Sequence, residues 1–152
     1  MSKRIVLVSC VKTKLNHPAP AQELYTSALF RGMRRYAERV GDAWYVLSAQ
    51  HGMLSPFETI APYERTLKAM LKRDRVDWAE RVQKKLLELL PPSADVIILA
   101  GEAYRESIVG FLEKHDFKVS VPMAGLKFGP QLSWLKKQNV TDNGERPNRG
   151  GG

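Results

Sequence analysis

Apolar strands that alternate with amphipathic helices predict an α/β fold for this chain of 152 residues. Continuous apolar runs at 5–9, 44–48 and 96–100 are typical of strands buried on both faces of a parallel sheet. A weaker run at 118–121 predicts a fourth strand. We therefore expect a three-layer α/β/α arrangement around a mostly parallel, four-stranded sheet. The order of the strands does not follow from the sequence.

Helices are expected between these strands. Leu29, Met33 and Val40 recur at helical spacing within 21–40, and Gly41 follows as a C-terminal stop. Further helices are predicted at 65–71, 77–90, 104–114 and 131–137. We expect residues 1–140 to form one domain of ordinary size. The polar, glycine-rich residues 141–152 are expected to form a disordered tail.

The amino-acid composition limits the kinds of partner and compartment that we expect for this protein. The 24 lysines and arginines exceed the 16 acidic residues and give a net charge of +8, which favours a polyanionic partner, although ordinary solubility charge is an alternative. No apolar run reaches the roughly 18 residues of a membrane span, and no signal-peptide pattern is present. We expect a cytoplasmic protein without a membrane partner, and its oligomeric state stays open.

Metals and cofactors are not expected. A single cysteine, Cys10, excludes an internal disulfide and a cysteine-based zinc site. His17, His51 and His115 share no metal-ligand spacing. The glycines form neither a Walker phosphate loop nor the three-glycine dinucleotide fingerprint.

The loops after the four strands predict where a ligand binds. In open parallel sheets, ligands bind outside the carboxyl ends of the strands. The loops at that edge are 10–14, 48–64, 101–104 and 122–131. Gly101, Gly125 and Gly129 in two of them suggest backbone positions that need room or a positive φ.

The loop 48–64 is the richest in polar groups. His51 could donate to a base or sugar, or move a proton near neutral pH, and a hydrogen bond within the loop is the alternative. Tyr63, after the stiffening Pro62, offers a face for stacking or a half-buried core position. Glu64 could orient a water or steady a developing cation, or it could simply lie near a helix N-terminus.

The loop 10–14 offers a thiol and two ammonium groups. Cys10 could be a nucleophile, with Lys12 and Lys14 lowering its pKa if they lie close. The alternative is a small core residue at the end of a buried strand. Lys12 is a candidate contact for an anion.

Several ordered blocks of this sequence resemble known families. Residues 47–56, LSAQHGMLSP, and 60–64, IAPYE, resemble the signature of YaaA-related proteins. A family of small uncharacterised bacterial and phage domains looks closer still. It shares the Cys-x-Lys-x-Lys start at 10–14, the helix at 23–30 and the closing block at 125–135. The resemblance covers residues 4–137.

The resemblance implies a fold and a site. YaaA-type proteins are associated with peroxide stress and DNA binding, and their core is similar to the uracil-DNA-glycosylase-like α/β fold. A domain of archaeosine-forming tRNA enzymes is similar as well. Carried over to this sequence, the implied pocket comprises Cys10, Lys12, Tyr25, Ser48, His51, Gly52, Pro62, Tyr63, Glu64, Gly101, Tyr104, Gly125 and Gln131.

Two functions fit these residues. The first is an enzyme that hydrolyses an N-glycosidic bond, in which Glu64 and His51 are the catalytic residues and Tyr63 or Tyr104 holds the base. In this hypothesis Gln131 hydrogen-bonds the base and Lys12 contacts a phosphate. The alternative is a non-catalytic DNA- or RNA-binding module of the YaaA type, involved in stress response. DNA is favoured over RNA as the partner, and a free nucleobase or nucleotide also fits.

Overall fold

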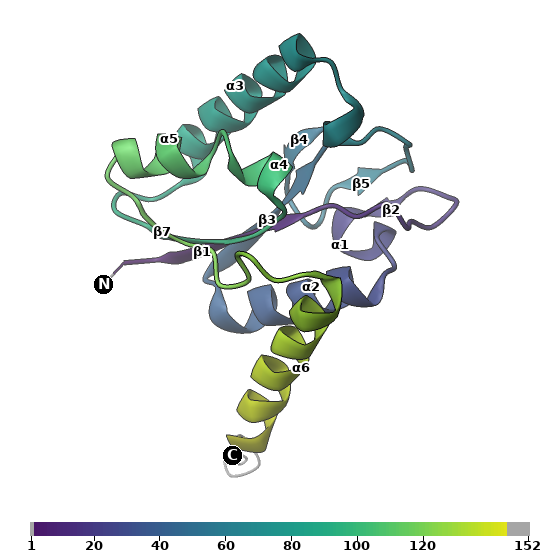
Figure 1. The fold of residues 1–152 in the computed structure, drawn as a ribbon, viewed down its shortest axis with the longest axis vertical. Helices are drawn as coiled ribbons and strands as arrows, with labels where there is room; N and C mark the ends of the chain where they lie inside the picture. Colours follow the sequence, from purple (N-terminus) through teal and green to yellow (C-terminus); the bar gives the residue numbers. More distant parts are fainter. Residues whose placement is uncertain (1, 146–152) are drawn as a thin grey trace.

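A five-stranded sheet forms the centre of the molecule (Figure 1). The computed structural model describes residues 2–145, and side chains are described through Asn139. The strands lie in the order β4-β3-β1-β6-β7. Their bounds are Arg4–Ser9 for β1, Ala43–Ser48 for β3, Gly52–Leu54 for β4, Asp95–Leu99 for β6 and Lys118–Ser120 for β7.

The apolar runs form the buried strands that their sequence predicts. β1 is central: Leu7 pairs with Tyr45 of β3 on one side and with Ile98 of β6 on the other, and both pairings are parallel. β7 extends the parallel sheet beyond β6. The expected α/β class with a mostly parallel sheet is therefore confirmed.

The predicted number of strands was wrong by one. Residues 52–54 form β4, which pairs antiparallel with β3 and makes the sheet mixed. The chain reverses directly after β3, where Gly52 has a φ of +75°. Because β4 is so short and lies next to that turn, its sequence reads as part of a loop. A separate antiparallel pair joins β2 (Ala19–Pro20) to β5 (Thr59–Ile60).

Helices lie on both faces of the sheet (Figure 1). On one face lie α2 (Ala28–Val40) and α6 (Phe128–Glu145), and on the other lie α3 (Lys72–Leu89) and α5 (Val109–Lys114). None of the helices described is long and apolar enough to cross a membrane. Of the tail predicted from residue 141, positions 146–152 lie outside the described residues.

Tertiary contacts break or shift several predicted helices. The helix expected over 21–40 is divided into α1 (Ala21–Leu24) and α2, because Tyr25 is extended and Ser27 Oγ caps the new N-terminus by accepting from Phe30 N at 3.1 Å. The helix expected at 104–114 is divided into α4 (Glu102–Arg105) and α5, with Gln83 Nε2 donating to the Ser107 carbonyl at 2.7 Å between them. The segment 65–71 contains only a 3-10 turn, η1 (Leu67–Ala69).

The strand order places a crevice beside β1. From β1 the chain crosses through α2 to β3, and from there it passes through α3 to β6 on the opposite side of β1. Connections therefore leave the carboxyl ends of β1 and β6 in opposite directions. Ligand sites of α/β sheets lie at such switch points.

Candidate functional site

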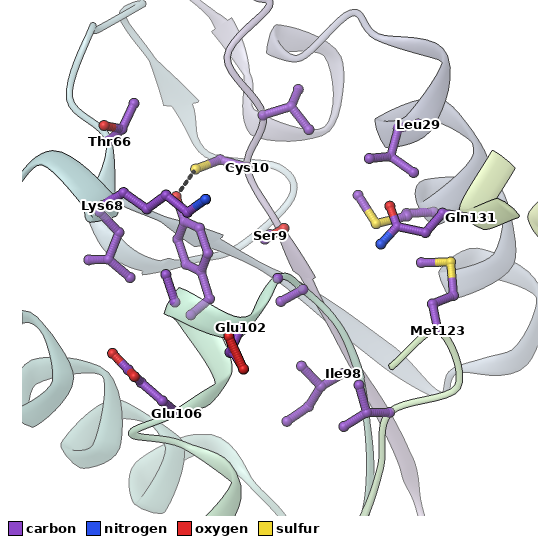
Figure 2. Close-up of a pocket in the computed structure, with 18 of the residues that line it drawn as sticks. Ser9, Cys10, Leu29, Thr66, Lys68, Ile98, Glu102, Glu106, Met123 and Gln131 are labelled. Atoms are coloured by element: carbon purple, nitrogen blue, oxygen red, sulfur yellow. Dashed lines mark hydrogen bonds between the residues drawn. The ribbon is translucent and has the colours of Figure 1, made fainter. Parts of the chain in front are cut away.

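A cavity of about 660 Å³ opens at the carboxyl ends of β1, β6 and β7 (Figure 2). Ser9 at the end of β1 lines it, as do Cys10 after β1, Gly101 after β6 and Val121 after β7. Its volume falls within the range of about 300–1,000 Å³ found for small-molecule sites. The predicted location of the site thus coincides with a real hollow in the molecule.

The walls of the cavity differ in character. On one side, η1, α3 and α4 contribute charged side chains, namely Lys68, Arg75, Glu102 and Glu106. Figure 2 shows Leu29, Gln131 and Met123 across the opening from Lys68 and Glu106, with Ile98 below them. A ligand with one charged and one apolar part fits such a division.

Ser9 and Cys10 lie where the cavity meets the sheet. Ser9 is 7% exposed and Cys10 is 9% exposed, so only a small part of each side chain faces the hollow. The Cys10 thiol and the Tyr104 hydroxyl are within hydrogen-bonding distance at 3.1 Å, and Tyr104 also lines the cavity. The backbone N–H of Cys10 donates to the Leu47 carbonyl at 2.9 Å, which fixes the thiol relative to β3.

A cluster of three hydroxyl groups, Tyr25, Tyr63 and Ser48, is buried close to Cys10. Tyr63 is its centre: its hydroxyl lies 2.6 Å from that of Tyr25 and 2.8 Å from Ser48 Oγ. Burial, followed by the proximity of Cys10, raises the pKa of both tyrosines well above the ordinary value. The same two causes raise the pKa of Tyr104. The three tyrosine hydroxyls, protonated at neutral pH like any tyrosine, therefore keep their protons to a higher pH than an exposed tyrosine would.

Ser48 links this hydroxyl cluster to the rest of the site. Its side chain is fully buried, and Oγ accepts from the backbone N–H of His51 at 3.0 Å. Its carbonyl accepts from Trp78 Nε1 at 2.8 Å, and the Trp78 ring meets the Tyr104 ring edge-on at 5.7 Å. The hydroxyl cluster and the cavity wall are thus joined through Trp78.

The cation beside the hydroxyl cluster is Lys14 rather than Lys12. Lys14 Nζ lies 4.6 Å from the centre of the Tyr63 ring and donates to the Lys12 carbonyl at 3.1 Å. An ammonium group over an aromatic face is held by the ring quadrupole. The Lys12 side chain is exposed and lies outside the lining of the cavity.

The predicted site residues divide into three groups. Cys10, Gly101, Tyr104 and Gln131 line the cavity. Tyr25, Ser48 and Tyr63 form the hydroxyl cluster next to it. The third group lies outside the cavity lining: Lys12, His51, Gly52, Pro62, Glu64 and Gly125.

The two predicted catalytic residues belong to that third group. His51 and Glu64 are both exposed, and the His51 ring meets the Tyr63 ring edge-on at 5.6 Å. Gly52 and Gly125 instead have backbone roles, with φ values of +75° and +79°. Room or a positive φ was expected at Gly101, Gly125 and Gly129. Of these three only Gly125 has a positive φ, and an added Cβ at Gly101 or Gly129 would meet nothing within 4 Å, so the expectation was wrong at those two glycines.

Several residues that line the cavity were not among the predicted site residues. Glu102 directly follows Gly101 in a loop already identified as part of the site, so its carboxylate could have been found there. Ser9 ends a predicted strand and reads as core. No local sequence pattern marks Lys68 and Arg75 as site residues, because their place in the cavity depends on how η1 and α3 fold over the strand ends.

Within the described part of the chain, no group of three or more histidine, cysteine, aspartate or glutamate side chains is placed to hold a metal ion.

Comparison with known proteins identifies relatives without a known activity. The model of DUF6884, a family of unknown function, matches residues 5–137. The uncharacterised protein YfjM of Bacillus subtilis (strain 168) is 25% identical over 133 residues, which cover 82% of this chain and 87% of YfjM. No solved structure matches the chain. The expected membership of an uncharacterised domain family is confirmed, and the resemblance to YaaA-related proteins stays a prediction.

Proposed function

Since the chain belongs to DUF6884, a family of unknown function, we propose from its cavity that it binds a nucleotide and hydrolyses the N-glycosidic bond. One observation carries this proposal: cations, carboxylates and an apolar wall face a single hollow at the switch point of the sheet. A nucleotide combines a phosphate, a sugar and a flat base, and each of these has a matching part of the wall.

The phosphate is assigned to Lys68 and Arg75. Both side chains line the charged side of the cavity. An arginine guanidinium binds phosphate through two parallel hydrogen bonds, and a lysine ammonium adds a compact positive charge. The phosphate contact expected from Lys12 is therefore reassigned to these two residues.

The base is assigned to the opposite, apolar wall. Leu29, Met33 and Met123 offer surfaces on which a base can lie. Gln131 Nε2 donates to the Leu126 carbonyl at 3.0 Å, which orients the amide and leaves its oxygen as an acceptor for a base edge. This retains the contact between Gln131 and the base that the sequence predicts.

Glu102 is the carboxylate proposed to drive hydrolysis. A water would attack C1′ of the sugar while the C1′–N bond breaks and its electron pair leaves with the base. The Glu102 carboxylate orients that water, accepts its proton and offsets the positive charge that develops on the sugar. Glu64, expected in this role, lies outside the lining, whereas Glu102 faces the cavity. Tyr104 lines the cavity, and its protonated hydroxyl donates a hydrogen bond to the bound nucleotide.

Base release from nucleoside 5′-monophosphates and from oligonucleotides, followed by mass spectrometry, tests the proposal. Glu102→Gln should lower turnover by about 10²–10⁴-fold, the usual contribution of a general base. The matched control is Glu113→Gln, an exposed acid on α5 that should leave turnover unchanged. Nucleotide binding without base release from any substrate would contradict the proposed hydrolysis and favour the non-catalytic DNA- or RNA-binding module.

The family resemblance supports the same substrate class. YaaA-type proteins are associated with DNA, and the uracil-DNA-glycosylase-like fold acts on bases, so a nucleotide ligand fits both. A free thiol at the cavity also fits a reducing compartment such as the cytoplasm.

A further inference from the structure

A second hollow, of about 430 Å³, lies between α2 and α6. Its lining on α2 includes Arg31, Gly32 and Arg35, whereas the cavity at the strand ends uses Leu29 and Met33 of the same helix. The two hollows therefore lie on different sides of α2. We call the second one the α2–α6 groove.

Close contact between the two helices shapes this groove. A Cβ atom at Gly32 would lie 3.2 Å from Leu135 Cδ1, so glycine lets α6 approach α2 more closely than a larger residue would. Arg39 Nη2 donates to Asn139 Oδ1 at 3.3 Å, and the rings of Tyr36 and Trp134 lie 5.1 Å apart. The groove thus has a fixed floor formed by packed helices.

The described charged residues of the groove are all positive. Arg31, Arg35 and Lys136 line it, all three side chains are exposed, and none of the described lining residues carries a carboxylate. Arg31 and Arg35 are one helical turn apart and so point the same way. By contrast, Arg34 on the adjacent face is paired with Glu38 at 3.0 Å. Residues 128–139, the part of α6 with described side chains, contain no acid.

We propose that the α2–α6 groove binds the phosphate backbone of single-stranded nucleic acid. Three cations from two helices, with no acid among the described lining residues, suit a ligand with successive negative charges. Guanidinium groups match phosphate oxygens geometrically, and Leu132 gives apolar surface for a sugar or base. An unpaired strand can lay a base or sugar on Leu132, whereas the bases of a duplex are stacked inside it and only its phosphates would be available. This binding does not depend on hydrolysis in the cavity.

Salt-dependent binding of a fluorescent single-stranded DNA of about 15 nucleotides tests the groove. The triple variant Arg31→Gln, Arg35→Gln, Lys136→Gln should bind at least tenfold more weakly. The slope of log affinity against log salt should fall by about 0.7 for each lost contact, about 2 in total. The matched control is Lys84→Gln, Lys85→Gln, Lys114→Gln, which removes the same charge from exposed positions on α3 and α5. This control should keep the affinity within about threefold, as expected for charges acting only at a distance.

Three results would overturn the groove as a nucleic-acid site. The first is equal loss of affinity in the two triple variants, which would mean that net charge alone matters. The second is unchanged binding in the groove variant, and the third is binding to phosphatidylserine vesicles but not to the oligonucleotide. Base release from nucleoside 5′-monophosphates, which have one phosphate and no backbone to follow the groove, is measured on the same wild-type protein, so failure of the proposed catalysis and failure of the groove are told apart.

Discussion

The hydroxyl oxygens of Tyr25 and Tyr63 lie 2.6 Å apart, although the residues are separated by 38 positions in the chain. Tyr25 is 1% exposed, so this hydrogen bond is shielded from water. It ties the break between α1 and α2 to the segment that follows β5. This hydrogen bond therefore holds together two chain segments that are far apart in the sequence and lie next to the cavity.

Removal of the central hydroxyl should destabilise the protein. Tyr63→Phe leaves the Tyr25 hydroxyl and Ser48 Oγ without their shared partner, and it should lower the free energy of unfolding by about 1–3 kcal/mol. Urea denaturation measures this. Tyr45→Phe is the control, because Tyr45 is half-buried on β3 and outside the hydroxyl cluster, and it should change stability by less than about 0.5 kcal/mol. Equal effects in the two variants would contradict the central role of Tyr63.

Alkaline pH should weaken the folded state through Tyr25. Burial raises the pKa of Tyr25 above that of the unfolded chain, so the folded state holds its proton where the unfolded state has lost it. The stabilisation is fully present below about pH 10 and declines as the pH rises further, by about 1.4 kcal/mol per pH unit for this one group. Urea denaturation between about pH 9 and about pH 11 should show a shallower decline in Tyr25→Phe than in the wild type. Identical slopes would argue against the raised pKa.

Occupation of the cavity should protect Cys10 from alkylation. Cys10 is the one cysteine of the sequence and lines the cavity, so its modification reports on this site alone. A nucleoside 5′-monophosphate at ten times its Kd should slow the reaction about tenfold, since about a tenth of the protein remains free. The combined variant Lys68→Ala, Arg75→Ala should need much more nucleotide for the same protection. Unchanged alkylation at saturating nucleotide would place the ligand elsewhere.

The turn after β3 should tolerate only glycine well. Gly52 has a φ of +75°, and an added Cβ would meet Arg81 and Val82 at an ordinary 3.6 Å, so the cost of Gly52→Ala comes from the backbone rather than from a clash. We expect a loss of about 1–2 kcal/mol in urea denaturation. Gly101→Ala is the control, because its φ is −72° and nothing lies within 4 Å of an added Cβ. A loss in Gly101→Ala as large as in Gly52→Ala would contradict this explanation.

The sequence predicts where in the fold the site lies better than it predicts which side chains act there. The runs at 5–8 and 96–100 are apolar throughout, which is typical of strands buried on both faces of a parallel sheet, so the edge that carries the ligand loops could be located. Cys10, Gly101 and Tyr104 follow directly from that edge. Gln131 ends the loop 122–131 at the same edge, and its choice within that loop comes from the resemblance.

There is a physical reason why the charged wall of the cavity could not be predicted from the sequence. Lys68 and Arg75 reach the cavity from η1 and α3, and no local pattern tells a lysine that points into a hollow from one that points into water. Glu64 shows the converse. Its position next to Tyr63 made it a candidate, yet neighbouring residues in an extended segment point in opposite directions, and its side chain is exposed.

The wall of the cavity is assembled from stretches of chain that span residues 9 to 131. No partial structure can therefore hold the ligand, because the hollow exists only once β1, β6, β7 and both helical layers are all in place. A ligand that binds only the folded state therefore raises the free energy of unfolding of the whole domain, rather than stabilising one loop. A destabilising substitution far from the cavity should therefore weaken binding without removing a single contact residue.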